Sequence, residues 1–328
     1  MKKYLLAAAA AGALLATSGS AMAEAVKLQL KWVTQAQFAG YFVAQAKGFY
    51  KDAGLEVTIQ PGGPDISPVQ VLAGGGADVI VNWMADALAS REKGVQIVNI
   101  AQPFKNSGLL FVCRKDTGIA SSADFKGKTL GVWFYGNEYP FMAWMSKLGL
   151  KTDGSADGVT VLKQAFNADP LIQKQADCIS AMVYNEYRQI LQAGMKVEEL
   201  VVFNYRDEGV GMLEDGLYVD EERLKDPAFA ATMAKFVKAS MKGWDYARAN
   251  TDEAAQIVVD NDTSGSTTLD HQRYMMGEIN KLTEGSDGSL AEADYDQTVD
   301  TLLSAGGVIT KKPEGAWTSV VTDAAKAM

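Results

Sequence analysis

Cysteine and histidine are almost absent from this chain, which has 328 residues but only two cysteines and one histidine. Zinc sites in proteins are built mainly from these two residue types, so the sequence predicts no metal site. Ser-His-Asp chemistry would depend on His271 alone, which we expect at the surface of a helical stretch, far from the strand ends. Cys113 and Cys178 could form one disulfide, but two separately buried thiols are the interpretation that we favour.

A long apolar run is also absent after residue 23, so we expect no membrane insertion of the remaining chain. Residues 1–23 combine Lys2 and Lys3, an apolar run over 4–17 and the small-residue ending Ala-Met-Ala. This pattern is typical of a secretory signal peptide, because a membrane span needs ~20 apolar residues. We predict cleavage after Ala23 and, in a Gram-negative host, a soluble periplasmic product.

Positive charge is scarce in the chain that follows. Residues 24–328 contain 29 basic and 40 acidic side chains, which gives a net charge of −11. A nucleic-acid-binding protein needs a basic face, so the sequence predicts no nucleic-acid partner. Carboxylate pairs such as Asp207 and Glu208 show no catalytic spacing. We therefore expect a protein that is not an enzyme and needs no cofactor.

Strands and helices alternate over the first two thirds of the mature chain, and this order predicts an α/β fold with parallel-rich sheets and flanking helices. The expected strands are 26–32, 55–59, 77–83, 95–100, 109–112, 129–133, 159–164, 179–184 and 200–204. Helices are expected at 38–52, after Pro68, at 138–148, after Asp169 and at 186–193, and the chain is almost wholly helical beyond 221. We predict two lobes: residues 24–109 and 214–328 form lobe 1, and residues 110–213 form lobe 2.

Candidate ligand contacts follow from the rule that open α/β sheets bind ligands just beyond the carboxyl ends of their strands. Thr34 and Gln35 lie at such a position, together with an unusually aromatic and acidic set. The residues that we select as ligand-binding are Trp32, Gln37, Tyr41, Asn82, Trp83, Asp86, Trp133, Tyr135, Asn137, Glu138, Tyr184, Glu186 and Asp207.

The chemistry of this set favours a flat ligand. Aromatic faces can sandwich a planar ring, and carboxylates and amides suit the amino groups and ring nitrogens of an amino-heterocycle. Each position also has a simpler interpretation. The tryptophans could belong to the core, Glu138 could be a charge favoured by a helix dipole, and Tyr184 to Glu186 could cap a helix.

Several short motifs resemble a known family. They are KW at 31–32, AGYFVA at 39–44, KGFY at 47–50, GLEV at 54–57, VQVL at 69–72 and AD at 77–78. The chain resembles the NMT1/THI5-like family of ABC-transporter solute-binding proteins, which are related to thiamine-pyrimidine binders. The resemblance is clearest over residues 28–140. It implies a two-lobe periplasmic-binding-protein fold of type II, with two crossover strands and the ligand in the cleft between the lobes.

The resemblance also implies partners: a small-molecule ligand and a membrane permease. We expect the protein itself to be a monomer. Relatives bind sulfonates, taurine, nitrate or riboflavin, so the family alone does not name the ligand. An acidic site disfavours an anion, and we therefore expect an aminopyrimidine or another vitamin-like ring. A fungal pyrimidine synthase in the family uses a cysteine-rich motif, a histidine and pyridoxal phosphate. In the corresponding region this chain has only Cys178 and no histidine.

Overall fold

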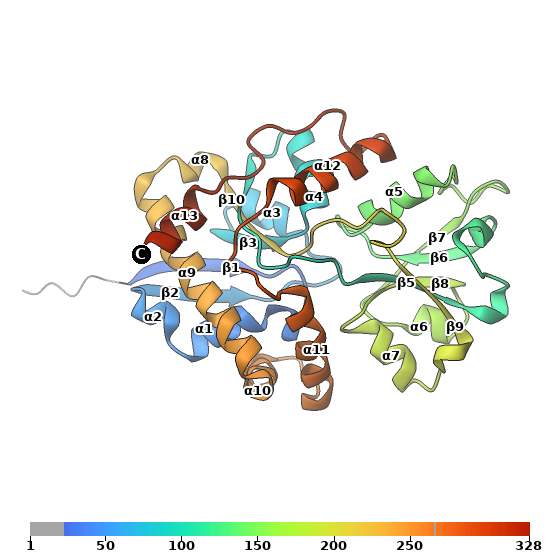
Figure 1. Ribbon diagram of the computed structural model, residues 1–328, viewed down its shortest axis with the longest axis horizontal. Helices are drawn as coiled ribbons and strands as arrows, with labels where there is room; N and C mark the ends of the chain where they lie inside the picture. Colours follow the sequence, from blue (N-terminus) through green and yellow to red (C-terminus); the bar gives the residue numbers. More distant parts are fainter. Residues whose placement is uncertain (1–22, 266) are drawn as a thin grey trace, which may run out of the picture.

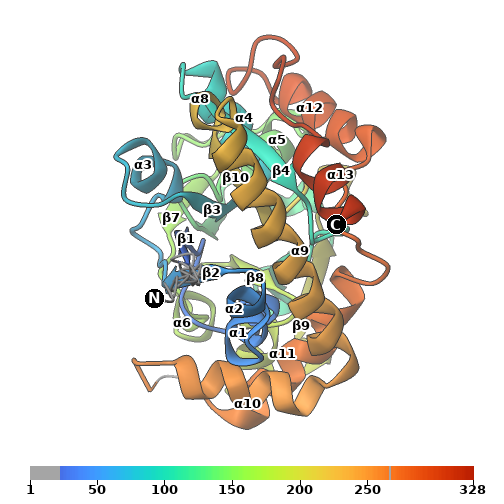
Figure 2. The same ribbon diagram turned by 90° about the vertical axis from the view of Figure 1, so that its left-hand side faces the viewer.

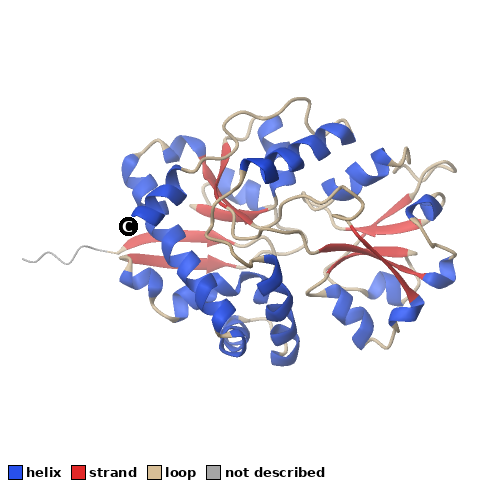
Figure 3. Ribbon diagram, in the orientation of Figure 1, coloured by secondary structure: helices blue, strands red, loops and turns tan. Residues whose placement is uncertain are grey.

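The structure is a computed structural model that describes residues 23–265 and 267–328. Its strands form two five-stranded sheets that lie at opposite ends of an elongated molecule (Figures 1 and 3). We use lobe 1 for the sheet built from strands before residue 102 and after 215, with its helices, and lobe 2 for the other sheet with its helices. The predicted signal peptide lies outside the described residues, apart from Ala23.

The sheet of lobe 1 has the order β2-β1-β3-β10-β4, with β1 parallel to β2 and β3 and with β10 antiparallel to both of its neighbours. The β2 sequence LEVTIQ alternates apolar and polar residues, and its side chains begin alternately buried and exposed. The sequence-based prediction missed β10, which enters from the second lobe. The strands are β1 (Glu24–Gln29), β2 (Leu55–Gln60), β3 (Val79–Asn82), β4 (Ile97–Ala101) and β10 (Gly216–Asp220).

Helices cover both faces of this sheet, and α9 runs across lobe 1 in contact with α1 and α13 (Figure 2). The C-terminal third therefore packs on lobe 1. The helix expected at 38–52 is broken at Gly48, whose φ of 75° is left-handed. The helices are η1 (Ala36–Phe38), α1 (Ala39–Ala46), α2 (Phe49–Asp52), α3 (Pro68–Ala73), α4 (Met84–Glu92), α8 (Glu221–Leu224), α9 (Pro227–Ala249), α10 (Thr251–Asn261), α11 (Leu269–Leu282), α12 (Glu292–Ala305) and α13 (Val320–Ala327).

Lobe 2 has the sheet order β7-β6-β8-β5-β9, and here β5 is the antiparallel strand. Its core contains a cluster of aromatic rings around Trp144, which lies 5.2 Å from the Phe125 ring and 5.1 Å from the Tyr205 ring. The elements are β5 (Leu109–Arg114), η2 (Lys115–Thr117), η3 (Ser122–Phe125), β6 (Thr129–Val132), α5 (Tyr139–Lys147), β7 (Thr160–Lys163), α6 (Asp169–Ile172), β8 (Cys178–Met182), α7 (Glu186–Gln192), η4 (Val197–Glu199) and β9 (Leu200–Asn204).

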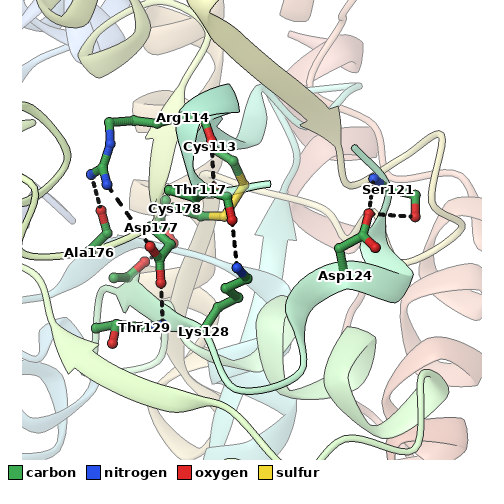
Figure 4. The surroundings of a disulfide bond; sticks show 12 residues. Cys113, Arg114, Thr117, Ser121, Asp124, Lys128, Thr129, Ala176, Asp177 and Cys178 are labelled. Atoms are coloured by element: carbon green, nitrogen blue, oxygen red, sulfur yellow. Dashed lines mark hydrogen bonds and ion pairs between the residues drawn. A yellow bond between two sulfur atoms is a disulfide. The ribbon is translucent and has the colours of Figure 1, made fainter. Parts of the chain in front are cut away.

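A disulfide joins Cys113 and Cys178, so the expectation of two separate thiols was wrong. The two residues are register partners on the antiparallel strands β5 and β8, with Cα atoms 3.9 Å apart. The neighbouring Asp177 accepts a hydrogen bond from the Thr129 backbone at 2.8 Å, as Figure 4 shows. Sequence spacing could not reveal this pairing, because the register of the two strands brings the cysteines together.

Two crossovers, residues 102–108 and 205–215, connect the lobes. Glu214 in the second crossover ties the two together, because its carboxyl group accepts hydrogen bonds from the Ser107 hydroxyl and from the Gly108 backbone at 3.1 Å. Each crossover leads into an antiparallel strand, β5 in lobe 2 and β10 in lobe 1. Of the helices in the described ranges, none has the length and apolar run needed to cross a membrane.

Candidate functional site

The carboxyl ends of β1 and β3 in lobe 1 lie opposite those of β6 and β8 in lobe 2, and side chains from all four ends enclose one cavity. This cavity measures about 20 Å³, which is room for about one water molecule. The residues that line it are Lys31, Trp32, Gln35, Gln37, Trp83, Trp133, Asn137, Met182, Tyr184 and Glu186. Seven of them belong to the predicted ligand-binding set.

Two tryptophans contact each other across the cleft in an edge-on arrangement. The rings of Trp32 and Trp133 have their centroids 5.9 Å apart and their planes at 60°. The Trp133 indole N–H donates to the carbonyl of Ala165 at 2.8 Å, and this hydrogen bond fixes the ring. Both side chains are buried, as in a protein core, but each packs on a ring of the opposite lobe.

In lobe 1 two residues of the cavity, Gln37 and Trp83, are held by Asp215, which lies in the second crossover. Its carboxylate accepts hydrogen bonds from Gln37 Nε2 at 2.6 Å and from Trp83 Nε1 at 3.1 Å. Burial raises the pKa of Asp215 to about 6, against the lowering effect of the Gln37 hydrogen bond and the Lys31 charge. Asp215 also has a left-handed φ of 37°, which is unusual for a residue with a side chain.

In lobe 2 the acidic residue of the cavity is Glu186, which begins α7. Its carboxyl group accepts hydrogen bonds from the Met182 backbone at 2.9 Å and from Asn185 Nδ2 at 2.7 Å. Burial raises the pKa of Glu186 to about 7. Tyr184 lines the same cavity, and its buried hydroxyl has no hydrogen-bond partner among residues 23–265 and 267–328. Such a group needs a partner, and a ligand could supply it.

One buried cation, Lys31, completes the wall of the cavity. Its ammonium group lies 3.6 Å from the Asp86 carboxylate and donates to the carbonyl of Tyr135 in lobe 2 at 3.1 Å. Asp86 also accepts from Asn82 Nδ2 at 2.9 Å. The predicted residues Asn82 and Asp86 thus lie behind Lys31 and do not line the cavity.

The remaining predicted residues lie farther from the cavity for identifiable reasons. Tyr41 points into the core and packs on the Trp244 ring at 5.6 Å. Tyr135 is 41% exposed, and its backbone is left-handed with a φ of 59°. Glu138 accepts from the Gly136 backbone at 2.8 Å and stabilises its own loop. Asp207 is exposed in the turn after β9, an edge strand that β5 separates from β8.

His271 does not lie where we expected it. Its Nε2 atom is 2.8 Å from Asn185 Oδ1, next to the carboxyl end of β8, so the predicted position far from the strand ends was wrong. Burial, together with the nearby Arg188 charge, lowers the pKa of His271. Helix α11 carries the histidine to this position, and a helix far along the sequence gives no signal of such contact.

Four residues of the site were not selected from the sequence: Lys31, Gln35, Met182 and Asp215. Lys31 was detectable, since it directly precedes Trp32 at the expected end of the first strand. Asp215 was not detectable, because its role depends on the second crossover bringing its carboxylate to Gln37 and Trp83.

A wider groove of about 550 Å³ lies on lobe 1 beside α9 and α13. It is lined by lysines such as Lys238 and Lys242, which are exposed, and it is open to solvent. The residues that line it include none from the strand ends at the cleft. We therefore place the candidate site in the cleft, where buried polar and aromatic groups converge. Within the described residues, no group of three or more His, Cys, Asp or Glu side chains could hold a metal ion.

Solved structures of other proteins share this architecture. A protein from Bordetella bronchiseptica superimposes with a TM-score of 0.74 at 21% identity, over 92% of this chain and 97% of that chain. The periplasmic aliphatic sulphonate binding protein SsuA from Escherichia coli superimposes with a TM-score of 0.63 at 14% identity, over 89% of this chain and 90% of that chain. The fold is the two-lobe periplasmic-binding-protein fold, which confirms the predicted fold class.

Sequence comparison identifies the family. Residues 35–254 match the family described as NMT1/THI5 like, so the chain belongs to the NMT1/THI5-like family and the predicted resemblance is confirmed. The formylaminopyrimidine-binding protein of Halalkalibacterium halodurans is 23% identical over 75% of this chain and 73% of its own length. The riboflavin-binding protein RibY of Chloroflexus aurantiacus is 25% identical over 76% of this chain and 70% of its own length.

The family also contains enzymes. A 4-amino-5-hydroxymethyl-2-methylpyrimidine phosphate synthase of Saccharomyces cerevisiae is 24% identical over 75% of this chain and 73% of its own length. Family membership alone therefore does not separate a binding protein from a synthase.

Proposed function

We propose that this chain is the solute-binding component of an ABC importer and that it captures a small heteroaromatic solute between its lobes. The observation that carries the proposal is the pair of Trp32 and Trp133, which approach each other from opposite lobes at 5.9 Å. Two aromatic faces can hold a planar ring between them. The relatives named for formylaminopyrimidine and riboflavin, both flat heterocycles, support this assignment.

The charges around the cavity favour a neutral or cationic ring. Glu186 and Asp215 are buried carboxyl groups, while the ammonium of Lys31 is already paired with Asp86 at 3.6 Å. Glu186 can accept a hydrogen bond from an amino group or a protonated ring nitrogen, and the unpartnered Tyr184 hydroxyl can bond to a second ring atom. An aminopyrimidine or a similar vitamin-like ring meets both requirements.

Capture requires the lobes to part and close again. The cavity of about 20 Å³ is smaller than any aromatic ring, so a ring enters only after Trp32 and Trp133 have separated. The two crossovers are the natural hinge for a rigid-body rotation of this kind. The ligand favours closure because it contacts both lobes only in the closed state. Small-angle scattering should show compaction on ligand addition, and an unchanged radius at saturation would contradict hinged closure.

We also propose that the protein works in the periplasm, as a monomer that delivers its ligand to a membrane permease. The Cys113–Cys178 disulfide supports an oxidising compartment, where such bonds persist. The lobe boundaries at residues 110 and 213 belong to the same proposal: residue 213 lies in the second crossover, and residue 110 lies at the start of β5, just beyond the first crossover.

Tryptophan fluorescence tests the ligand class. The protein is titrated with an aminopyrimidine, a purine, riboflavin and taurine. We expect the aminopyrimidine to cause a saturable change in tryptophan fluorescence. Trp32→Ala should abolish that change. Trp317→Ala, which alters a half-buried tryptophan packed on Tyr295 away from the cavity, should preserve it. Binding of taurine alone would overturn the proposed ligand class.

Two other functions have specific support. An alkyl sulfonate, taurine or nitrate is the second candidate ligand, because the cation Lys31 lines the cavity, although its ammonium already pairs with Asp86 at 3.6 Å. A pyrimidine-synthase activity is suggested by the yeast relatives, but the thiol of Cys178 is engaged in a disulfide. Incubation with pyridoxal phosphate and a search for Schiff-base absorbance distinguishes this activity from simple binding.

A further inference from the structure

The turn that follows β6 contacts lobe 1 through its backbone. Tyr135 and Gly136 both have left-handed backbones, with φ values of 59° and 91°. The carbonyl of Tyr135 accepts a hydrogen bond from the Lys31 ammonium at 3.1 Å. Gly136 is buried against Asp86, so the turn lies directly on the Lys31–Asp86 ion pair of the opposite lobe.

Only glycine fits at position 136 when the lobes are this close. A Cβ atom there would lie 2.1 Å from Asp86 Cγ and 2.5 Å from Asp86 Cβ. The clash involves the base of the Asp86 side chain, so rotation of the carboxylate does not remove it. The carboxylate is also held in place by Lys31 at 3.6 Å and by Asn82 at 2.9 Å.

We propose that the Tyr135–Gly136 turn and the Lys31–Asp86 pair form a closure latch, which sets how closely the two lobes approach. The latch adjoins the cavity, because Lys31 also lines it. Parting of the lobes removes the Tyr135 carbonyl from Lys31 but leaves the ion pair within lobe 1 intact. The latch therefore responds to closure and not to the ligand itself. It rests on the proposed function only in that closure is taken as the capture step.

A cross-lobe reporter can measure closure without any ligand. The exposed side chains of Asp65 in lobe 1 and Lys163 in lobe 2 form an ion pair across the cleft at 3.0 Å. In the variant Asp65→Cys/Lys163→Cys, a short bifunctional thiol reagent should bridge the two sites only when the lobes are closed. The two native cysteines are joined in a disulfide and do not compete for the reagent.

The test compares Gly136→Ala with Gly149→Ala in this reporter protein. Gly149 follows α5 with a left-handed φ of 68° and is exposed, and a Cβ atom at this position would have no neighbour within 4 Å. Gly149→Ala therefore places a side chain on a left-handed backbone, as Gly136→Ala does, but its Cβ atom meets no neighbouring residue. We expect bridging to slow at least tenfold in Gly136→Ala and to keep its rate in Gly149→Ala. Circular dichroism and thermal melting confirm that each variant is folded.

A rescue variant separates the clash from strain in the turn. Asp86→Gly removes the atoms that the Cβ at position 136 would meet, so Gly136→Ala/Asp86→Gly should regain most of the bridging rate. Equal rates in the reporter protein with and without Gly136→Ala would overturn the latch, as would a slow rate that Asp86→Gly leaves unchanged. Because no ligand is present, a failure to bind aminopyrimidines would not affect this result.

Discussion

The two lobes fix their cavity residues in different ways. In lobe 2, Glu186 is held by near neighbours along the chain, the Met182 backbone and Asn185. In lobe 1, Gln37 and Trp83 are held by Asp215, which lies far away in the sequence. We call the cavity residues that one lobe contributes its half-site. The half-site of lobe 2 is thus held by contacts that are local in the sequence, while the half-site of lobe 1 depends on the second crossover. A change in the crossover should therefore affect lobe 1 more than lobe 2.

The lobes also differ in what stabilises them, and replacing one buried tryptophan in each should show the largest effect. Trp144 is the centre of the aromatic cluster of lobe 2, and Trp244 packs between Tyr41 and Phe104 in lobe 1. Trp144→Ala and Trp244→Ala should each cost about 3–5 kcal/mol of unfolding free energy. Hydrogen exchange should localise each loss to one lobe. An equal loss of protection in both lobes would show that they unfold as one unit.

The disulfide is the second difference between the lobes, because it cross-links strands of lobe 2 only. The bond closes a loop with a sequence separation of 65, and Cys113→Ala/Cys178→Ala should cost about 2–4 kcal/mol of unfolding free energy. Denaturant unfolding measures the loss. Treating the unmodified protein with a reductant provides the matched comparison, since it opens the same bond without a substitution. Weakened protection in lobe 1 would contradict the assignment of this bond to lobe 2 alone.

The crossovers that join the lobes should make stability depend on pH. Burial, reinforced by the Asp215 charge, raises the pKa of Glu214 from 4.5 to about 8. Between these values the folded protein holds a proton that the unfolded chain has released. The stability that Glu214 contributes is therefore complete below the unfolded pKa and declines as pH rises through about 8, by up to about 1.4 kcal/mol per pH unit.

Glu214→Gln should flatten this dependence when unfolding is measured by denaturant at a series of pH values. Glu284→Gln, which changes an exposed residue, serves as the control and should leave the slope unchanged. An identical slope in Glu214→Gln and the unmodified protein would mean that Glu214 does not carry the effect.

The smallest expected effect concerns ligand affinity, and it compares the two half-sites directly. Glu186→Gln should weaken binding of an aminopyrimidine about tenfold, which corresponds to ~1.4 kcal/mol, because a carboxylate acceptor is lost. Asp215→Asn should weaken it through Gln37 and Trp83, and hydrogen exchange should then report changes confined to lobe 1. Titration calorimetry measures both. Unchanged affinity in Glu186→Gln would remove this residue from the proposed contacts.

Local sequence predicted the strand ends well, because apolar alternation and turn residues act over a few positions. The rule about strand ends selected Trp32, Trp83, Trp133 and Glu186, all of which line the cavity. The rule failed for Asp207, because it says nothing about which strand lies at a sheet edge. The strand prediction from local sequence overlooked β10, whose pairing depends on the chain returning from lobe 2.

Composition and short-range periodicity were enough to establish the α/β class, the acidic balance and the aromatic character of the strand ends. The acidic balance is a count over the whole chain, and the other properties follow from patterns that extend over a few neighbouring positions. The Cys113–Cys178 bond, the support of Gln37 by Asp215 and the approach of Gly136 to Asp86 became visible only in three dimensions. Each of these joins residues far apart in the chain, and their contact depends on strand register and on how closely the lobes approach.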